Sequence, residues 1–364
     1  MRKCSSGGRV SRRMMAPGMH TMVRTRIYFP RSAARPLIGL NTFCGVQEKS
    51  DRQSLSCPSP PPEAIEGSAS SASLQRTLHF PLYFSGQFFV PISYTFNIRM
   101  SSMQSTSLFS VKDKVVLVTG GGRGIGLMIA HGFVANGAKV YISSRSAKVC
   151  DKVAEELSKL GPGQCISIPA DLQSLDEVKR LTAEIAKRES KVHVLVNNAG
   201  ANWGESINTY PDQAFEKVLN LNLKRVFSLT QSMLPLLLAA GTSSSPASII
   251  NIGSVDGIRN PSQETYAYSA SKAALHQMTR VMAGHLGSKH VTCNAIAPGP
   301  FESKMMAQTL KDHGDEIVAG VPLGRIGQPE DIAATAIYLA SRAGAYTTGA
   351  IIPVDGGVLV AAKA

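Results

Sequence analysis

Residues 115–126 have the sequence VVLVTGGGRGIG, and this stretch decides the fold of the chain. A short apolar run of the strand type ends at Thr119, and glycines follow at positions 120, 124 and 126. Glycines between a strand and a helix permit a tight turn and let a pyrophosphate approach the backbone at the helix N-terminus. A lone glycine cluster also occurs in ordinary turns, so its meaning depends on the surrounding sequence.

The chain beyond Lys114 alternates short apolar runs with helix-length amphipathic stretches. Continuous apolar strands that alternate with helices predict a parallel sheet covered on both faces. We therefore expect one Rossmann-type, doubly wound α/β domain with a seven-stranded parallel sheet. The expected strands are 115–118, 139–142, 165–168, 192–196, 248–252, 291–296 and 351–354. The expected helices are 124–136, 147–160, 174–188, 212–239, 266–286 and 329–341.

Charge divides the chain into an N-terminal extension, residues 1–105, and a body, residues 106–364. The extension has 13 Lys and Arg against 4 Asp and Glu, whereas the body has 25 against 21. The basic character belongs mainly to the extension, so the body gives little reason to expect a nucleic-acid partner. The six cysteines show neither metal-ligand nor disulfide-framework spacing, and we expect ordinary thiols and no metal site.

The extension supports more than one interpretation. Residues 1–47 hold nine Arg or Lys and no acid, which is typical of a mitochondrial transit peptide, and residues 50–75 are rich in Ser and Pro, which is typical of disorder. Residues 78–98 are uncharged, but Pro81 and Pro91 interrupt them, so we expect no membrane span. Translation that starts at Met100 or Met103 would give a complete body. We favour this last interpretation, with a cytoplasmic location, over import into the mitochondrial matrix.

Tyr268 and Lys272 lie four residues apart in the sequence YSASK. A phenol with the ordinary pKa of about 10 exchanges protons poorly at neutral pH. Residues i and i+4 share a helix face, so we expect the Lys272 ammonium to lower the Tyr268 pKa and make the phenol a usable acid or base. Tyr266 has Ala270 four residues on and is the poorer acid. Alone, a Tyr–Lys pair is more often a solvated helix surface; beside the glycine run it indicates carbonyl–alcohol redox with a nicotinamide.

Residues 143–146, SSRS, follow the second expected strand, where NAD-preferring folds carry an acid that binds the ribose. No Asp or Glu occurs from 137 to 150. Arg145 and Arg123 instead offer two cations to a 2′-phosphate, which favours NADP(H). The alternative, two solvated surface arginines, does not explain the missing acid.

These motifs together resemble the short-chain dehydrogenase/reductase family over residues 108–358, and within it the NADP-dependent 3-oxoacyl reductases. The motifs are TGGGRGIG at 119–126, NNAG at 197–200, Asn222, Ser254, YxxxK at 268–272, Pro-Gly at 298–299 and Asp-Gly-Gly at 355–357. Stretches 297–305 and 344–357 are most similar to the rhamnolipid-pathway β-ketoacyl reductase subgroup.

The resemblance implies a catalytic tetrad of Asn222, Ser254, Tyr268 and Lys272. Tyr268 would give a proton to the substrate carbonyl, Lys272 would lower the Tyr268 pKa and hold the nicotinamide ribose, Ser254 would bond the developing oxyanion, and Asn222 would hold a water that links Lys272 to solvent. The cofactor-binding residues that the resemblance implies are Gly120, Arg123, Gly124, Ile125, Gly126, Arg145, Asp171, Leu172, Asn198, Ala199, Gly200, Tyr268, Lys272, Pro298, Gly299 and Ser303.

The resemblance also implies a reaction and partners. It favours NADPH-dependent reduction of a ketone to a secondary alcohol, with a 3-oxoacyl thioester carried on a carrier protein or on CoA as substrate, and it implies a homo-oligomer, a dimer or a tetramer. Two alternatives stay open: a secondary-alcohol dehydrogenase acting on a polyol, steroid or polyketide-type ketone, and a catalytically silent NADP-binding protein, against which the intact tetrad argues. Segment 301–321 resembles the family's mobile substrate lid, but its sequence does not identify the substrate.

A chain that begins at Met103 should fold and keep full activity, because every expected strand and catalytic residue lies after that position. The measurement is the specific activity and the thermal midpoint of the shortened and full-length proteins. An insoluble or inactive short protein beside an active full-length one would show that the extension is needed by the body. Mass spectrometry of the native N-terminus would distinguish a start at Met100 or Met103 from cleavage within the basic region.

Overall fold

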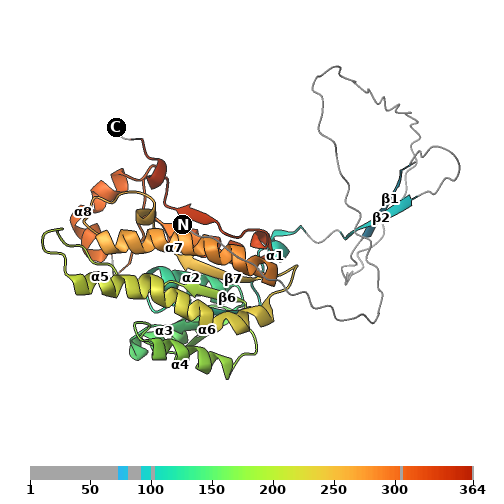
Figure 1. Cartoon of the computed structure of the whole chain (residues 1–364), viewed down its shortest axis with the longest axis horizontal. Coiled ribbons are helices and arrows are strands. Elements are labelled where there is room, and N and C mark those ends of the chain that lie inside the picture. The colour runs from blue at the N-terminus through green and yellow to red at the C-terminus, as the bar shows by residue number, and fades with distance from the viewer. Residues whose placement is uncertain (1–72, 81–91, 100–102, 304–305, 363–364) are drawn as a thin grey trace, which may run out of the picture. The chain divides into compact units, whose positions relative to one another are not determined.

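The computed structural model describes residues 73–80, 92–99, 103–303 and 306–362. Its body is built on a seven-stranded parallel sheet with the strand order β5-β4-β3-β6-β7-β8-β9 (Figure 1). The expected α/β fold class is confirmed, and each expected strand is present within two residues of its expected ends. The strands are β3 (Val115–Thr119), β4 (Lys139–Ser143), β5 (Gln164–Ser167), β6 (Val194–Asn197), β7 (Ala247–Ile252), β8 (Val291–Pro298) and β9 (Ile351–Val354).

Helices cover both faces of this sheet (Figure 1). The expected helix at 212–239 is one continuous stretch in the chain, but Asn220–Lys224 within it form a π-helical turn that separates α5 from α6. The helices are α1 (Ser105–Leu108), α2 (Gly124–Ala135), α3 (Ala147–Ser158), α4 (Leu175–Ala186), α5 (Asp212–Leu219), α6 (Arg225–Ala240), α7 (Tyr266–Leu286), α8 (Ala307–Ala319) and α9 (Pro329–Ala340).

Strand β3 shows why the sheet is hidden on both sides, because all five of its residues are buried. Successive side chains of a strand point to opposite faces. Val116 and Val118 therefore pack into one apolar cluster with residues of α2 and α9, while Val115 and Leu117 pack into a second with residues of α4, α6 and α7. Two separate cores hold one sheet between them.

The strand order reverses between β3 and β6. From β3 the chain proceeds outward through β4 to β5, and it then returns to place β6 on the other side of β3. In open parallel sheets this reversal leaves a crevice at the carboxyl ends of the two strands, where ligands bind. The glycine run after β3 and the Asn197–Gly200 segment after β6 both begin at this point.

Two further strands fall in the extension, where we expected no folded element. Strands β1 (Ser73–Phe80) and β2 (Ile92–Arg99) pair antiparallel, with Ser73 opposite Arg99 and Phe80 opposite Ile92. The basic segment 1–47 lies outside the described residues, as does most of the Ser/Pro-rich segment 50–75, so the transit-peptide interpretation stays a prediction. In the part of the chain that the structure describes, every helix is too short or too polar to span a bilayer.

Candidate active site

A cavity of about 1390 Å³ opens at the carboxyl ends of the parallel strands. All but two of the predicted site residues line it; the exceptions are Gly126 and Asn222. The predicted residues that line the cavity are Gly120, Arg123, Gly124, Ile125, Arg145, Asp171, Leu172, Asn198, Ala199, Gly200, Ser254, Tyr268, Lys272, Pro298, Gly299 and Ser303.

The glycine run forms a turn that only glycine adopts without strain at two of its positions. Gly120 has φ of +67° and Gly124 has φ of +53°, in the left-handed region. Gly126 is buried instead, and a Cβ there would lie 2.4 Å from both Asn198 Nδ2 and Gly120 O. The sequence predicted Gly126 as a cofactor contact, but the structure gives it a packing role, because α2 must approach the turn closely.

Thr119, the last residue of β3, ties that strand end to the segment after β6. Its buried hydroxyl donates to Val196 O at 3.2 Å and accepts the backbone N–H groups of Asn198 and Ala199 at 2.9 and 3.0 Å. The Asn198 side chain donates in turn to Thr119 O at 2.8 Å. In the sequence, the sign of this role is a hydroxyl at the end of an otherwise apolar strand.

One end of the cavity carries positive charge. Arg123 and Arg145 are exposed on the cavity wall, and neither forms an ion pair with any other residue that the structure describes. Ser144 and Asp171 line the same cavity, and the Asp171 carboxylate accepts the Gln173 N–H at 3.1 Å. Two uncompensated guanidiniums beside a glycine turn fit a phosphorylated dinucleotide, because each can pair with a phosphate.

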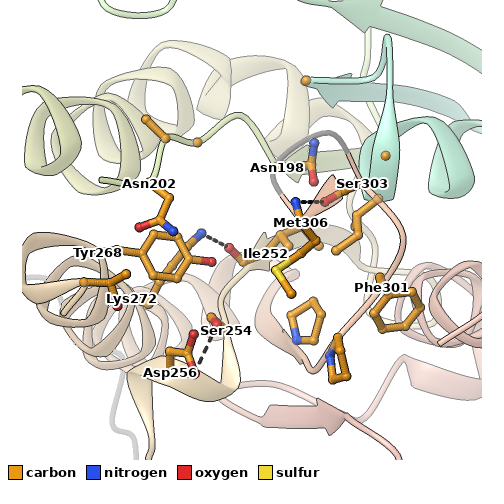
Figure 2. Close-up of a pocket in the computed structure, with 18 of the residues that line it drawn as sticks. Asn198, Asn202, Ile252, Ser254, Asp256, Tyr268, Lys272, Phe301, Ser303 and Met306 are labelled. Carbon is orange, nitrogen blue, oxygen red and sulfur yellow. Dashed lines mark hydrogen bonds between the residues drawn. The ribbon is translucent and has the colours of Figure 1, made fainter. Parts of the chain in front are cut away.

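Tyr268, Lys272 and Ser254 meet further along the cavity, from the first turns of α7 and the end of β7 (Figure 2). Lys272 is buried, its Nζ donates to Ile252 O at 2.7 Å, and this Nζ lies 5.5 Å from the centre of the Tyr268 ring. The Ser254 Oγ accepts the Asp256 backbone N–H at 3.1 Å. That bond leaves the hydroxyl proton of Ser254 available to the cavity.

The pKa values of this pair correct one prediction. Burial raises the pKa of Tyr268 to about 12, opposed by a hydrogen bond with Ser254, and burial lowers the pKa of Lys272 to about 8. We expected Lys272 to lower the Tyr268 pKa below its ordinary value, and for this structure that expectation is wrong. The reason is desolvation, which disfavours the phenolate and the ammonium alike.

Asn222 lies behind the cavity wall, within the π-helical turn. Its Oδ1 accepts the Ala201 N–H at 2.8 Å, and its Nδ2 donates to Ala201 O at 2.9 Å and to Ser271 Oγ at 3.0 Å. Ser271 donates to the backbone carbonyl of Tyr268 at 2.7 Å. The Asn222 side chain thus holds the loop after β6 to the first turns of α7. The nearby Asn220 points elsewhere and donates to Gln173 O at 3.1 Å.

The two tyrosines of α7 have different surroundings. Tyr266 is 39% exposed, does not line the cavity, and donates its hydroxyl to the exposed Glu264. Hydrogen bonding to Glu264, more than any other contact, raises its pKa. The sequence-based choice of Tyr268 over Tyr266 therefore agrees with their positions.

The far end of the cavity is partly polar. Helix α8, within the predicted lid segment, contributes Thr309, His313, Glu316 and Ile317 to the wall, and Met306 lies just before it. Met305, which belongs to the same predicted lid, lies outside the described residues. The loop after β7 adds two charged residues to the cavity lining that the sequence did not point to, Asp256 and Arg259.

This chain belongs to the short-chain dehydrogenase/reductase family and is an oxidoreductase. The family model described as enoyl-(acyl carrier protein) reductase matches residues 120–359. A rhamnolipid-biosynthesis 3-oxoacyl-acyl-carrier-protein reductase of Pseudomonas aeruginosa is 46% identical over 251 residues, 68% of this chain and 97% of that protein. A 3α-hydroxysteroid dehydrogenase of Mediterraneibacter gnavus is 34% identical over 249 residues, 68% of this chain and 97% of that protein.

A solved structure, the Pseudomonas aeruginosa RhlG/NADP active-site complex, matches with a TM-score of 0.67 and 45% sequence identity, covering 70% of this chain and 99% of that one. These comparisons confirm the family resemblance drawn from the motifs. They also show that the similarity covers the body of the chain and nearly the whole length of each relative.

Replacing Arg145 with Asp should weaken NADPH binding by about 10- to 100-fold, the loss expected for a charge-assisted hydrogen bond with added repulsion. NADH binding should change by less than about threefold, because NADH has no 2′-phosphate to repel. Fluorescence titration of both cofactors measures this. Lys148→Asp is the matched control: it makes the same change in charge three residues away, outside the cavity wall. A wild-type protein that binds NADH more tightly than NADPH would contradict the interpretation of Arg145.

Proposed function

We propose that this protein reduces a 3-oxoacyl thioester to the 3-hydroxyacyl thioester with NADPH. The observation that carries this is the meeting of Tyr268, Lys272 and Ser254 in one cavity that also presents a glycine turn and two arginines, which form no ion pair with any described residue. The first group suits proton transfer to a carbonyl, and the second suits a phosphorylated dinucleotide. The 46% identity to a 3-oxoacyl-acyl-carrier-protein reductase supports the choice of substrate class.

NADP(H) fits the residues that are present. The turn at Gly120 and Gly124 and the N-terminus of α2 would take the pyrophosphate, and Arg123 and Arg145 would take the 2′-phosphate. When bound, NADPH supplies the hydride that the carbonyl carbon accepts. Everything else in the reaction is a matter of holding the substrate oxygen and delivering one proton to it.

Tyr268 is the proton donor in this proposal. With its pKa raised to about 12, the phenol carries its proton at neutral pH, and transfer becomes favourable as negative charge develops on the substrate oxygen. Ser254, which hydrogen-bonds Tyr268 in this structure, would donate its hydroxyl proton as a hydrogen bond to the same substrate oxygen, while its oxygen accepts the Asp256 N–H. Both groups stabilise charge that forms only in the transition state.

Lys272 has two functions in this proposal. Its ammonium, held at Ile252 O, stabilises the phenolate that Tyr268 becomes, and its pKa of about 8 lets it pass a proton more readily than an exposed lysine. Lys272 would also hold the nicotinamide ribose. Asn222 would hold the water that reconnects Lys272 to solvent, and its bonds to Ala201 keep the wall in place.

We propose a cytoplasmic homo-oligomer that takes its substrate on a carrier protein or on CoA. The relatives named above support a thioester carrier, since one of them is described as acting on acyl carrier protein. The relatives named above do not support the mitochondrial alternative, which rests on the basic residues of segment 1–47 alone.

A second candidate is a secondary-alcohol dehydrogenase acting on a hydroxylated ketone such as a steroid or a ketose. The specific observation behind it is the polar part of the cavity lining, to which α8 contributes His313 and Glu316 and the loop after β7 contributes Asp256 and Arg259. The 34% identity to a hydroxysteroid dehydrogenase points in the same direction.

Oxidation of NADPH against a panel of carbonyl compounds decides between the two candidates. The panel contains an acetoacetyl thioester, a longer 3-oxoacyl thioester, a 3-ketosteroid and a ketose. We expect kcat/KM to be highest for a thioester. A steroid or ketose that is turned over more efficiently than both thioesters would replace the first proposal with the second, and no turnover of any member would contradict both.

Tyr268→Phe should lower kcat by about 100- to 10,000-fold, because it removes a positioned acid and nothing else. NADPH affinity should change by less than about twofold, since only one hydroxyl is lost from the cavity wall. Single-turnover kinetics and cofactor titration measure the two quantities. Tyr266→Phe, two residues away and outside the cavity, should keep the wild-type rate. Retention of more than about a tenth of the wild-type kcat in Tyr268→Phe would rule out the phenol as the donor.

A further inference from the structure

A carboxylate stands beside the proposed proton donor. Asp256 lies two residues after Ser254, in the 3₁₀ turn Val255–Gly257, and it lines the same cavity as Tyr268 (Figure 2). Its side chain is 25% exposed, and its backbone N–H fixes the Ser254 hydroxyl at 3.1 Å. Because the Asp256 carboxylate is partly buried, its negative charge interacts with the phenol more strongly than it would in bulk water.

Among the residues that the structure describes, Arg259 is the cation that pairs with this carboxylate. Arg259 Nε lies 3.3 Å from Asp256 Oδ1, and the Arg259 backbone N–H donates to Val255 O at 2.8 Å. Arg259 also lines the cavity, and its side chain is 45% exposed. The pair is thus held on one short segment that follows Ser254 and lines the same cavity as Tyr268.

Few other charges face the phenol. Lys272 lies behind it on α7, and burial together with the charges of Lys272 and Arg280 lowers the pKa of His276, one turn further on, to about 4, so that this ring is neutral at pH 7. From α8, His313 and Glu316 line the cavity and contact each other at 3.2 Å. The charge of Asp256 raises the Tyr268 pKa, in addition to the larger effect of burial.

We propose that Asp256 and Arg259 are positioning residues that act as an opposed pair on proton transfer at Tyr268: the carboxylate favours the protonated phenol, and the guanidinium limits that effect. The inference rests on the proposed carbonyl reduction. It adds that the relative rates of reduction and oxidation at a given pH depend on these two charges and not on the tetrad alone.

The proton balance explains why direction is affected. In reduction the phenol proton moves to the substrate oxygen as the carbonyl carbon gains hydride, and Tyr268 becomes a phenolate that is reprotonated from solvent. In oxidation the phenolate must exist first, because it takes the hydroxyl proton as hydride leaves the carbinol carbon for NADP⁺. A nearby carboxylate opposes the phenolate, so at neutral pH it favours reduction over oxidation.

The test uses the full-length protein with four variants. Asp256→Asn keeps the shape and removes the carboxylate charge; Arg259→Gln leaves the carboxylate without its partner; Arg259→Lys restores the positive charge. Glu264→Gln is the matched control. It removes a carboxylate from the same loop, and this carboxylate contacts Tyr266 and does not line the cavity. The pH dependence of kcat/KM is measured in both directions, and the phenol is titrated by tyrosinate absorbance as the difference from Tyr268→Phe.

We expect the alkaline midpoint for reduction to fall in Asp256→Asn and to rise in Arg259→Gln, each by a shift on the order of one pH unit. Oxidation at neutral pH should change up to about tenfold, faster in the first variant and slower in the second. Arg259→Lys should return the midpoint toward wild type, and Glu264→Gln should not move it.

Two results would overturn the inference: midpoint shifts of the same sign in Asp256→Asn and Arg259→Gln, or unmoved midpoints with only a loss of kcat. A merely structural pair lowers the rate in both variants but does not shift their midpoints in opposite directions. The absorbance titration requires no turnover. If no carbonyl compound is reduced by the wild type, the proposed function fails, while opposite shifts of the tyrosinate titration would still support the electrostatic pair.

Discussion

The hydroxyl of Thr119 is the interaction on which the rest of the site depends. One side chain, buried at the end of β3, makes three hydrogen bonds to the segment that leaves β6. These two strands flank the point where the strand order reverses. A parallel sheet supplies a crevice there but no means of keeping two loops at a fixed separation. Thr119 supplies it, and a valine in its place would leave two partly buried N–H groups without this acceptor.

The glycines are explained by the same junction. Asn198 reaches back to Thr119 O, and this places its side-chain nitrogen where a Cβ on Gly120 would be at 2.6 Å and one on Gly126 at 2.4 Å. The spacing of the glycine run therefore serves two needs. Gly120 and Gly124 adopt left-handed turns that face the cavity, whereas Gly126 lets α2 pack against the loop. A phosphate-binding motif is also a packing motif, and its residues need not all touch the ligand.

The sequence predicted most of this fold because local patterns and tertiary structure agree. Continuous apolar runs such as 115–118 belong to buried parallel strands, and the Tyr268–Lys272 spacing required only that 266–286 be a helix, which it is. The π-helical turn Asn220–Lys224 could not be predicted, because its composition does not distinguish it from the α-helices on either side. Nor could the effects of burial on Tyr268 and Lys272 or the closeness of Asp256, which depend on the surrounding fold and not on the order of residues.

Burial acts on the phenol and the ammonium in opposite directions, and this bears on how the site does its chemistry. A phenol whose pKa is raised to about 12 holds its proton, and an ammonium whose pKa is lowered to about 8 gives its proton up more easily. The two groups therefore move apart in proton affinity, because the ordinary pKa values of both lie near 10. Proton transfer from the Lys272 ammonium to the phenolate that Tyr268 becomes, directly or along a hydrogen-bonded water, is thus more downhill than it would be if only Lys272 were desolvated. Helix α7 holds both groups on one face, four residues apart, so this difference in pKa follows from where that helix is buried.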